Sequence, residues 1–118
     1  MKIAFAIQKQ EGWDSIINSR FGRTENFALY DEKSDSFSYK SNEENVDAGH
    51  GAGIQASQIV VNFGAEVVIT GGSYGPKAFD VLKAAKIKTF SQVGEITLKE
   101  AYKNFKANKY SETLESDK

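Results

Sequence analysis

Three short segments in the first third of the chain alternate along their length, which is typical of β-strands. Residues 2–7 alternate isoleucine or phenylalanine with alanine, so that one face is large and the other is small. Strict alternation of this kind predicts a strand, and the small face leaves room for a closely packed helix. Residues 26–31 and 36–40 also alternate, and the polar stretch 32–35 between them predicts a hairpin turn. These segments predict an antiparallel meander.

The pattern then changes to helices alternating with short strands. Residues 51–63 carry apolar side chains at helical spacing and are followed by a glycine suited to a C-cap. The β-branched run at 67–69 predicts a central strand covered on both faces. Pro76 fits the first position of a second helix, and residues 87–90 predict a last strand. A capping box at 97–100 predicts a third helix.

The order β-β-β-α-β-α-β-α predicts an α/β fold with a mixed five-stranded sheet. Helices that join the later strands imply parallel, right-handed crossovers. The 118 residues suit one domain, which we place at 1–105. Residues 106–118 are polar and are predicted to form a flexible tail.

Composition narrows the function classes. The formal net charge of -1 gives no general attraction to nucleic acid or to an anionic membrane, so neither is expected as a partner. The absence of cysteine excludes disulfides, thiolate metal sites and a cysteine nucleophile. No apolar run approaches the ~20 residues of a membrane span, and the first residues do not resemble a signal peptide. We therefore expect a cytoplasmic protein.

Six of the ten glycines fall in two clusters, and each cluster precedes a predicted helix. The clusters are residues 49–53 and 71–76. Glycine allows positive φ and close approach of a ligand to the backbone, and helix N-termini favour anions. If the N-termini of the two predicted helices lie side by side, they would form an anion pocket with His50, the only histidine, at its rim. The alternative is a pair of tight turns that bind nothing.

Outside the glycine clusters, few residues are candidates for ligand or partner binding. Arg20 and Arg23 flank Phe21-Gly22, and an arginine on such a loop could clamp a carboxylate or phosphate; the alternative is a solvated surface pair. His50 alone would make a poor zinc site. Trp13 is either an exposed partner-binding aromatic or a half-buried packing residue. The second glycine cluster lacks the P-loop spacing, and no acid–base pair or nucleophile constellation supports an enzyme.

Several motifs together resemble the dinitrogenase iron–molybdenum cofactor biosynthesis family. The resemblance covers residues 1 to about 105 and rests on the segments Ser19-Arg20-Phe21-Gly22-Arg23, Phe27 to Asp31, Gly49-His50-Gly51-Ala52-Gly53, and Gly71-Gly72-Ser73-Tyr74-Gly75-Pro76-Lys77-Ala78-Phe79 with Leu82. It implies a ribonuclease H-like fold and a non-enzymatic role in binding or carrying iron–sulfur or iron–molybdenum clusters. It also implies cluster donor and acceptor proteins as partners.

The resemblance places the ligand site in three loops. The implied cofactor-binding residues are Arg20, Phe21, Gly22, Gly51, Gly53, Gly71, Gly72, Ser73 and Gly75, with His50 as provisional metal ligand. The chain departs from the family where Lys86 stands in place of a glycine before the last strand, which costs stability if that position needs positive φ.

The second departure is the missing cysteine, since iron–sulfur clusters are normally held by thiolates. A site of backbone N–H groups, arginine and one imidazole suits an anionic cluster that arrives preassembled and leaves again. Two other hypotheses stay open. One is a metal-free regulatory module that binds a small anion or nucleotide through the same loops. The other is a protein–protein adaptor that uses the exposed sheet edge or the Trp13 segment.

Overall fold

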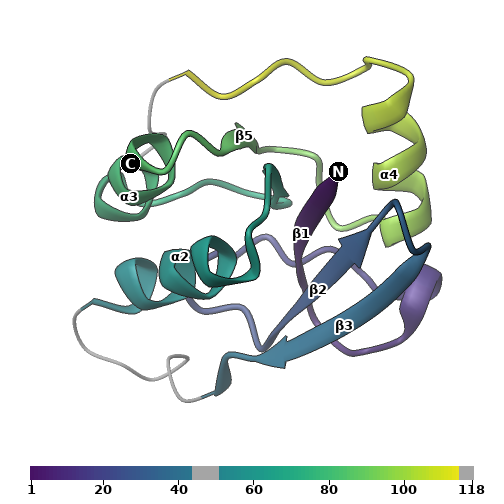
Figure 1. Cartoon of the computed structure of the whole chain (residues 1–118), viewed down its shortest axis with the longest axis horizontal. Helices are drawn as coiled ribbons and strands as arrows, with labels where there is room; N and C mark the ends of the chain where they lie inside the picture. The colour runs from purple at the N-terminus through teal and green to yellow at the C-terminus, as the bar shows by residue number, and fades with distance from the viewer. Residues whose placement is uncertain (44–50, 115–118) are drawn as a thin grey trace.

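The computed structural model describes residues 1–43 and 51–114 and contains the predicted mixed sheet (Figure 1). The strands are β1 (Lys2–Ile7), β2 (Asn26–Asp31), β3 (Ser36–Ser41), β4 (Val67–Ile69) and β5 (Lys88–Phe90). They lie in the order β3-β2-β1-β4-β5. The pairs β1–β2 and β2–β3 are antiparallel, whereas β1–β4 and β4–β5 are parallel. The predicted meander followed by two parallel strands is confirmed.

The two faces of β1 carry two different cores, as the alternation of its side chains predicts. Ala4 and Ala6 face α2 (Ala52–Phe63) and α3 (Pro76–Ala84). Ile3, Phe5 and Ile7 face the other way, toward α4 (Leu98–Lys106). In Figure 1, α2 and α3 lie on the opposite side of the sheet from α4. Small residues on the first face let the two helices pack close to the strand.

The helix ends follow the sequence signals. Gly51 precedes α2 and Gly64 follows it, at φ 79° and 82°, so both take the left-handed conformation that glycine favours. Pro76 is the first residue of α3. Thr97 caps α4, because its hydroxyl accepts the backbone N–H of Glu100.

The long connection between β1 and β2 is more structured than its polar sequence suggests. It contains a short 3-10 helix, η1 (Gly12–Asp14). Beyond η1, Ile17 of the same connection is fully buried and forms a β-bridge with Ile7, while Ile16 forms one with Thr97. This connection therefore packs against the α4 side of the sheet.

The described part of the tail lies along β5 (Figure 1). The backbone N–H of Thr113 donates to the carbonyl of Thr89 at 2.7 Å, and the Thr89 hydroxyl donates to the carbonyl of Thr113 at 3.0 Å. Glu112 forms an ion pair with Lys83 at 2.9 Å. The part of the predicted flexible tail that the structure describes is thus tied to the sheet edge at Thr113 and to α3 at Glu112.

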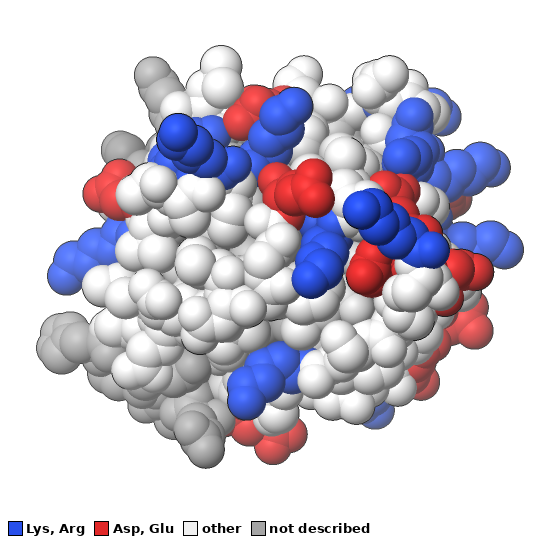
Figure 2. Space-filling view, in the orientation of Figure 1, with Lys and Arg blue, Asp and Glu red and all other residues white. Residues whose placement is uncertain are grey.

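Charge is unevenly distributed over the surface that Figure 2 shows. The sequence of α2 contains no charged residue, and the surface over it is largely uncharged. Lysines and acidic residues are intermixed on the side where α4 lies. Among residues 1–43 and 51–114, no helix is long and apolar enough to cross a membrane.

Candidate functional site

A cavity of about 440 Å³ lies where the Arg20 loop meets the starts of α2 and α3. Its described lining consists of arginines, glycines and one alanine: Arg20, Gly22, Arg23, Gly51, Ala52, Gly53 and Gly75. Arg20 and Arg23 are the only arginines in the chain. Both guanidinium groups of the protein therefore line this cavity.

Close backbone contacts bring the three segments of this cavity together. A Cβ placed on Gly22 would stand 3.1 Å from both the Cα and the N of Gly53. A Cβ placed on Gly53 would stand 3.2 Å from the Cβ of Ala78 in α3. Both distances are tighter than ordinary side-chain contacts, so glycine at these two positions lets the loop, α2 and α3 converge.

The starts of α2 and α3 direct backbone donors toward the same region. The first intrahelical bond of α2 runs from Gln55 N–H to the carbonyl of Gly51, so the N–H groups of residues 52–54 have no partner within the helix. In α3 the first bond runs from Phe79 N–H to the carbonyl of Gly75. Within the described residues no side chain caps either helix. Two uncapped helix N-termini make the cavity favourable for an anion.

Asn18 fixes the backbone beneath Arg20. It is buried, and its carbonyl accepts the Gly71 N–H at 2.9 Å and the Thr70 hydroxyl at 3.1 Å. Its side-chain oxygen accepts the Arg20 N–H at 3.0 Å. Arg20 is also paired with Ser73 in a parallel bridge. The loop that carries the arginine is therefore held against the loop after β4.

A second buried asparagine, Asn42, holds the other side of the arginine loop. Its side-chain amide donates to the carbonyls of Gly22 and Thr24, at 3.1 Å and 2.9 Å. Neither asparagine was predicted from the sequence, because Asn18 accepts from residues 70 and 71 and Asn42 donates to residues 22 and 24, all distant in the chain. An isolated polar residue in a polar segment gives no local signal for such a role.

Phe21 anchors the same loop from inside the core. Its side chain is 2% exposed and packs edge-on against Phe27 and Tyr74. The Tyr74 hydroxyl lies within hydrogen-bond distance of the carbonyls of Val68 and Phe90, at 3.1 Å and 2.6 Å. Phe21 therefore positions its neighbours in the loop, while its own ring lies away from the cavity lining.

The structure brings together part of the predicted set. The cavity is lined by five of the residues implied by the family resemblance, namely Arg20, Gly22, Gly51, Gly53 and Gly75, and adds Arg23 and Ala52. Gly71 and Gly72 lie beneath the site, where a Cβ on Gly72 would fall 2.1 Å from the carbonyl oxygen of Ser19. Ser73 contributes through its bridge to Arg20. His50 lies outside the described residues.

The described lining is cationic and offers no ready-made metal site. It contains no carboxylate. Both arginines also line an adjoining cavity of about 180 Å³ together with Glu25, whose carboxylate accepts the Asn18 amide at 2.9 Å. Within residues 1–43 and 51–114, no group of three histidines, cysteines or acidic residues could hold a metal ion. The chemistry of the lining thus suits binding of a whole anion through charge and backbone N–H groups.

Comparison with known proteins shows which family this chain belongs to. The profile described as "Dinitrogenase iron-molybdenum cofactor" matches residues 1–108. The chain belongs to this family. It is similar to the apo form of the orange protein from Desulfovibrio gigas, with 32% identity and a TM-score of 0.91, over 99% of this chain and 96% of the other.

A second solved structure of the same architecture is that of a Thermotoga protein assigned to the DUF35 family. It shares 28% identity with a TM-score of 0.81, over 99% of this chain and 98% of the other. No curated protein sequence matches the chain. The family membership and the α/β fold predicted from the sequence are confirmed, and a role connected with the iron–molybdenum cofactor follows at the level of the family.

Proposed function

We propose that this protein is a non-enzymatic carrier that binds a preassembled, anionic metal–sulfur cluster in the arginine-lined cavity. The observation that carries the proposal is the convergence of Arg20 and Arg23 with two helix N-termini that no described side chain caps. The family membership supports it, because the family is described by the iron–molybdenum cofactor. The match to the orange protein, whose solved structure is an apo form, is consistent with a ligand that can leave.

The absence of cysteine decides the mode of binding that we propose. Without thiolates the chain cannot supply the usual protein ligands of an iron–sulfur cluster. Arginine forks and backbone N–H groups instead bind the outer sulfurs of a cluster that brings its own ligands, as they bind other anions. Such a site holds its cargo reversibly, which suits transfer between a donor protein and an acceptor protein.

His50 is the proposed metal ligand. It directly precedes Gly51, which lines the cavity. A neutral imidazole can coordinate a metal, and the positive end of a helix dipole favours the neutral form. One imidazole bond would add specificity for a metal-containing anion over other anions of the same charge.

Anaerobic reconstitution tests the proposal. The purified protein is mixed with isolated iron–molybdenum cofactor or its iron–sulfur precursor, desalted, and analysed for bound metal and visible absorbance. We expect stoichiometric uptake by the wild type and binding weakened by about tenfold or more in Arg20→Ala, since charge-assisted hydrogen bonds contribute about 1.5–3 kcal/mol. Lys9→Ala removes an exposed cation elsewhere and is the matched control.

His50→Ala separates the two parts of the proposal. Reduced uptake in this variant supports imidazole ligation. Equal uptake by His50→Ala and the wild type overturns the ligand assignment but leaves the carrier role intact. Absence of uptake by the wild type overturns the carrier role itself.

A second candidate function uses the same cavity without a metal. The described lining holds donors for an anion but no metal ligand, which also fits a regulatory module for a small anion or nucleotide. A thermal-shift series with inorganic phosphate, nucleotides and the isolated cluster discriminates the two. Stabilisation by a phosphorylated compound, lost in Arg20→Ala and without metal uptake, would favour this second function.

A further inference from the structure

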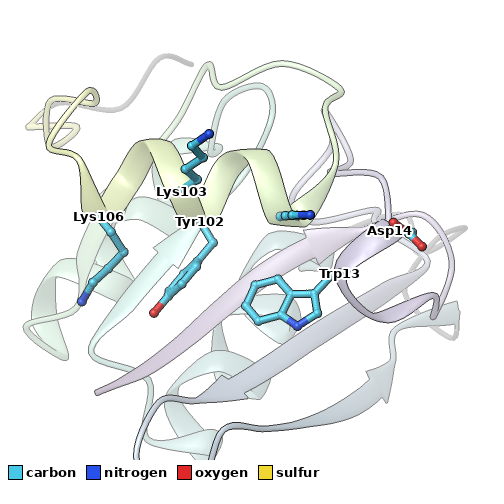
Figure 3. A pocket seen from close by; sticks show the side chains of 6 residues that line it. Trp13, Asp14, Tyr102, Lys103 and Lys106 are labelled. Carbon is cyan, nitrogen blue, oxygen red and sulfur yellow. The ribbon is translucent and has the colours of Figure 1, made fainter.

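A second cavity, of about 520 Å³, lies beside α4 on the side of the sheet opposite α2 and α3 (Figure 3). It is lined by two aromatic residues, three lysines and one aspartate: Trp13, Asp14, Lys99, Tyr102, Lys103 and Lys106. None of these residues lines the arginine cavity. The two cavities therefore belong to different layers of the molecule.

The aromatic part of this cavity is preformed. The Trp13 ring lies 4.9 Å from Phe37, 5.1 Å from Tyr30 and 5.3 Å from Tyr102, measured between ring centroids. These edge-on and tilted contacts hold the half-buried indole in place. Figure 3 shows Trp13 and Tyr102 beneath α4, with Lys103 and Lys106 projecting from the same helix. An apolar side chain entering here would meet a surface that is already ordered.

The lysines form a row along one side of α4. Lys99, Lys103 and Lys106 are spaced four and three residues apart, so they share a helix face. At 1.5 Å per residue the row is roughly 10 Å long. Lys106 pairs with Glu32 at 3.0 Å, whereas no ion pair within the described residues involves Lys99 or Lys103.

Helix electrostatics explain only part of this row. Lys103 and Lys106 lie in the last turn of α4, where cations complement the helix dipole. Lys99 lies in the first turn, where the dipole disfavours a cation. Lys99 and Lys103 are also like charges at four-residue spacing, which destabilises a helix. An anionic partner lying along the row would relieve both costs.

We propose that this surface, defined by Trp13, Tyr102, Lys99, Lys103 and Lys106, binds an acidic segment of a partner protein. Residues 98–109 carry four lysines and one glutamate within a chain of net charge -1, so the positive charge is local. Lys99 and Lys103 are about 6 Å apart along the helix. Alternate side chains of an extended peptide are separated by ~6.5 Å. Two alternate carboxylates can therefore reach both lysines while a neighbouring apolar residue contacts Trp13.

Other anionic ligands fit this surface less well. The described lining has no arginine and no glycine loop of the kind that surrounds a phosphate, and the start of α4 is already capped by Thr97. The docking surface is independent of the cluster proposal, because it shares no residue with the arginine cavity.

Trp13 provides the readout, since it is the only tryptophan in the chain. The full-length protein is titrated with a synthetic heptapeptide, Glu-Ser-Glu-Phe-Glu-Ser-Glu, while tryptophan emission is recorded. The control peptide carries glutamine in place of every glutamate. We expect a saturable change with the acidic peptide only, weakened as salt rises from 50 to 300 mM, because screening reduces the charge attraction.

Charge reversal on α4 provides the matched test. Lys99→Glu combined with Lys103→Glu should lower the affinity by at least about tenfold. The control pair Lys9→Glu and Lys33→Glu reverses two exposed lysines outside the surface and should bind like the wild type. Circular dichroism confirms that the variants are folded.

Three results would overturn the proposal. One is the absence of an emission change with the acidic peptide. Another is an equal response to the glutamine peptide, or to inorganic phosphate or a nucleotide at the same concentration. The third is unchanged binding by the folded double variant on α4. Arg20→Ala should bind the peptide normally, so failure of this test and failure of the cluster proposal are distinguishable.

Discussion

Gly22 lies against Gly53 so closely that a Cβ on Gly22 would stand 3.1 Å from the backbone N and Cα of Gly53. The neighbouring atoms are backbone, so the loop or α2 must shift to admit a methyl group. We expect Gly22→Ala to lower the free energy of unfolding by about 1–3 kcal/mol, as overpacking does. It should also weaken anion binding, because the shift separates Arg20 and Arg23 from the start of α2. Urea denaturation and the reconstitution assay measure the two effects.

Gly75→Ala is the control for this prediction. Gly75 also lines the cavity, but a Cβ there meets nothing within 4 Å and its φ is −70°. Gly75→Ala should lower the free energy of unfolding by less than about 1 kcal/mol, the scale of an N-cap change. If the two variants lose the same stability, close packing of Gly22 on Gly53 is not what holds the loop.

The sequence predicts what depends on local periodicity. The alternation in β1 predicts both of its faces, and Ala4 indeed packs toward α2 and α3 while Phe5 packs toward α4. The helix ends at Gly64 and Pro76 are equally local signals. The helices between the later strands predict that these strands are joined by parallel crossovers, as β1–β4 and β4–β5 confirm.

The sequence does not predict features that depend on contacts between distant segments. Asn18 reaches the Gly71 loop and Asn42 reaches Gly22, and neither lies in a periodic segment. Ile17 is fully buried although the connection that carries it is largely polar. The family resemblance did identify the arginine loop, but that Arg23 joins Arg20 in one cavity is a result of the fold.

Glu32 links the chain start to α4 and makes stability depend on pH. The Tyr102 hydroxyl donates to the Glu32 carboxylate, and Lys106 and the N-terminal ammonium also bind it. These partners, the Tyr102 hydrogen bond first, lower the pKa of Glu32 from its ordinary 4.5 to about 2. The unfolded chain therefore binds a proton more readily than the folded chain as the pH falls. The stabilisation is fully present above about pH 5.5 and is lost toward pH 2.

Glu32→Gln should remove most of this dependence. We expect the variant to be less stable than the wild type at pH 7, by of order 2 kcal/mol, with the two curves converging near pH 2. Denaturation at several pH values between 2 and 7 measures the difference. Glu95→Gln changes an exposed carboxylate and should follow the wild type. A constant gap between wild type and Glu32→Gln across this range would contradict the assignment.

Lys86 adopts the conformation for which glycine is suited. It follows α3 with φ 61°, and its N–H donates to the carbonyl of Lys83 at 2.9 Å. The left-handed region costs a residue with a Cβ roughly 1 kcal/mol. Lys86→Gly should therefore raise the free energy of unfolding, by up to about 1 kcal/mol. Ala85→Gly, at φ −83°, should lower it, since glycine gains nothing there. If both variants are destabilised alike, backbone strain at Lys86 is negligible.

The segment 110–114 covers the β5 edge of the sheet. Thr113 pairs with Thr89 through two hydrogen bonds, and the hydroxyls of Ser91 and Thr113 lie 2.7 Å apart. Tyr110 packs against the α4-side core and accepts a hydrogen bond from the side chain of Asn104. An uncovered edge strand presents unpaired N–H and C=O groups to other chains. We therefore expect this segment both to stabilise the fold and to keep copies of the chain apart.

Two truncations test this function of the segment. A chain that ends at Lys109 loses the contacts of Tyr110, Glu112 and Thr113, whereas a chain that ends at Leu114 keeps them all. We expect the shorter chain to lose about 1–3 kcal/mol of stability, the scale of a few net hydrogen bonds and one half-buried aromatic. Light scattering should show self-association of the shorter chain alone, because only there is β5 free to pair. Equal stability and equal monodispersity of the two truncated chains would show that β5 needs no cover, and that the pairing of Thr113 with Thr89 contributes little to the fold.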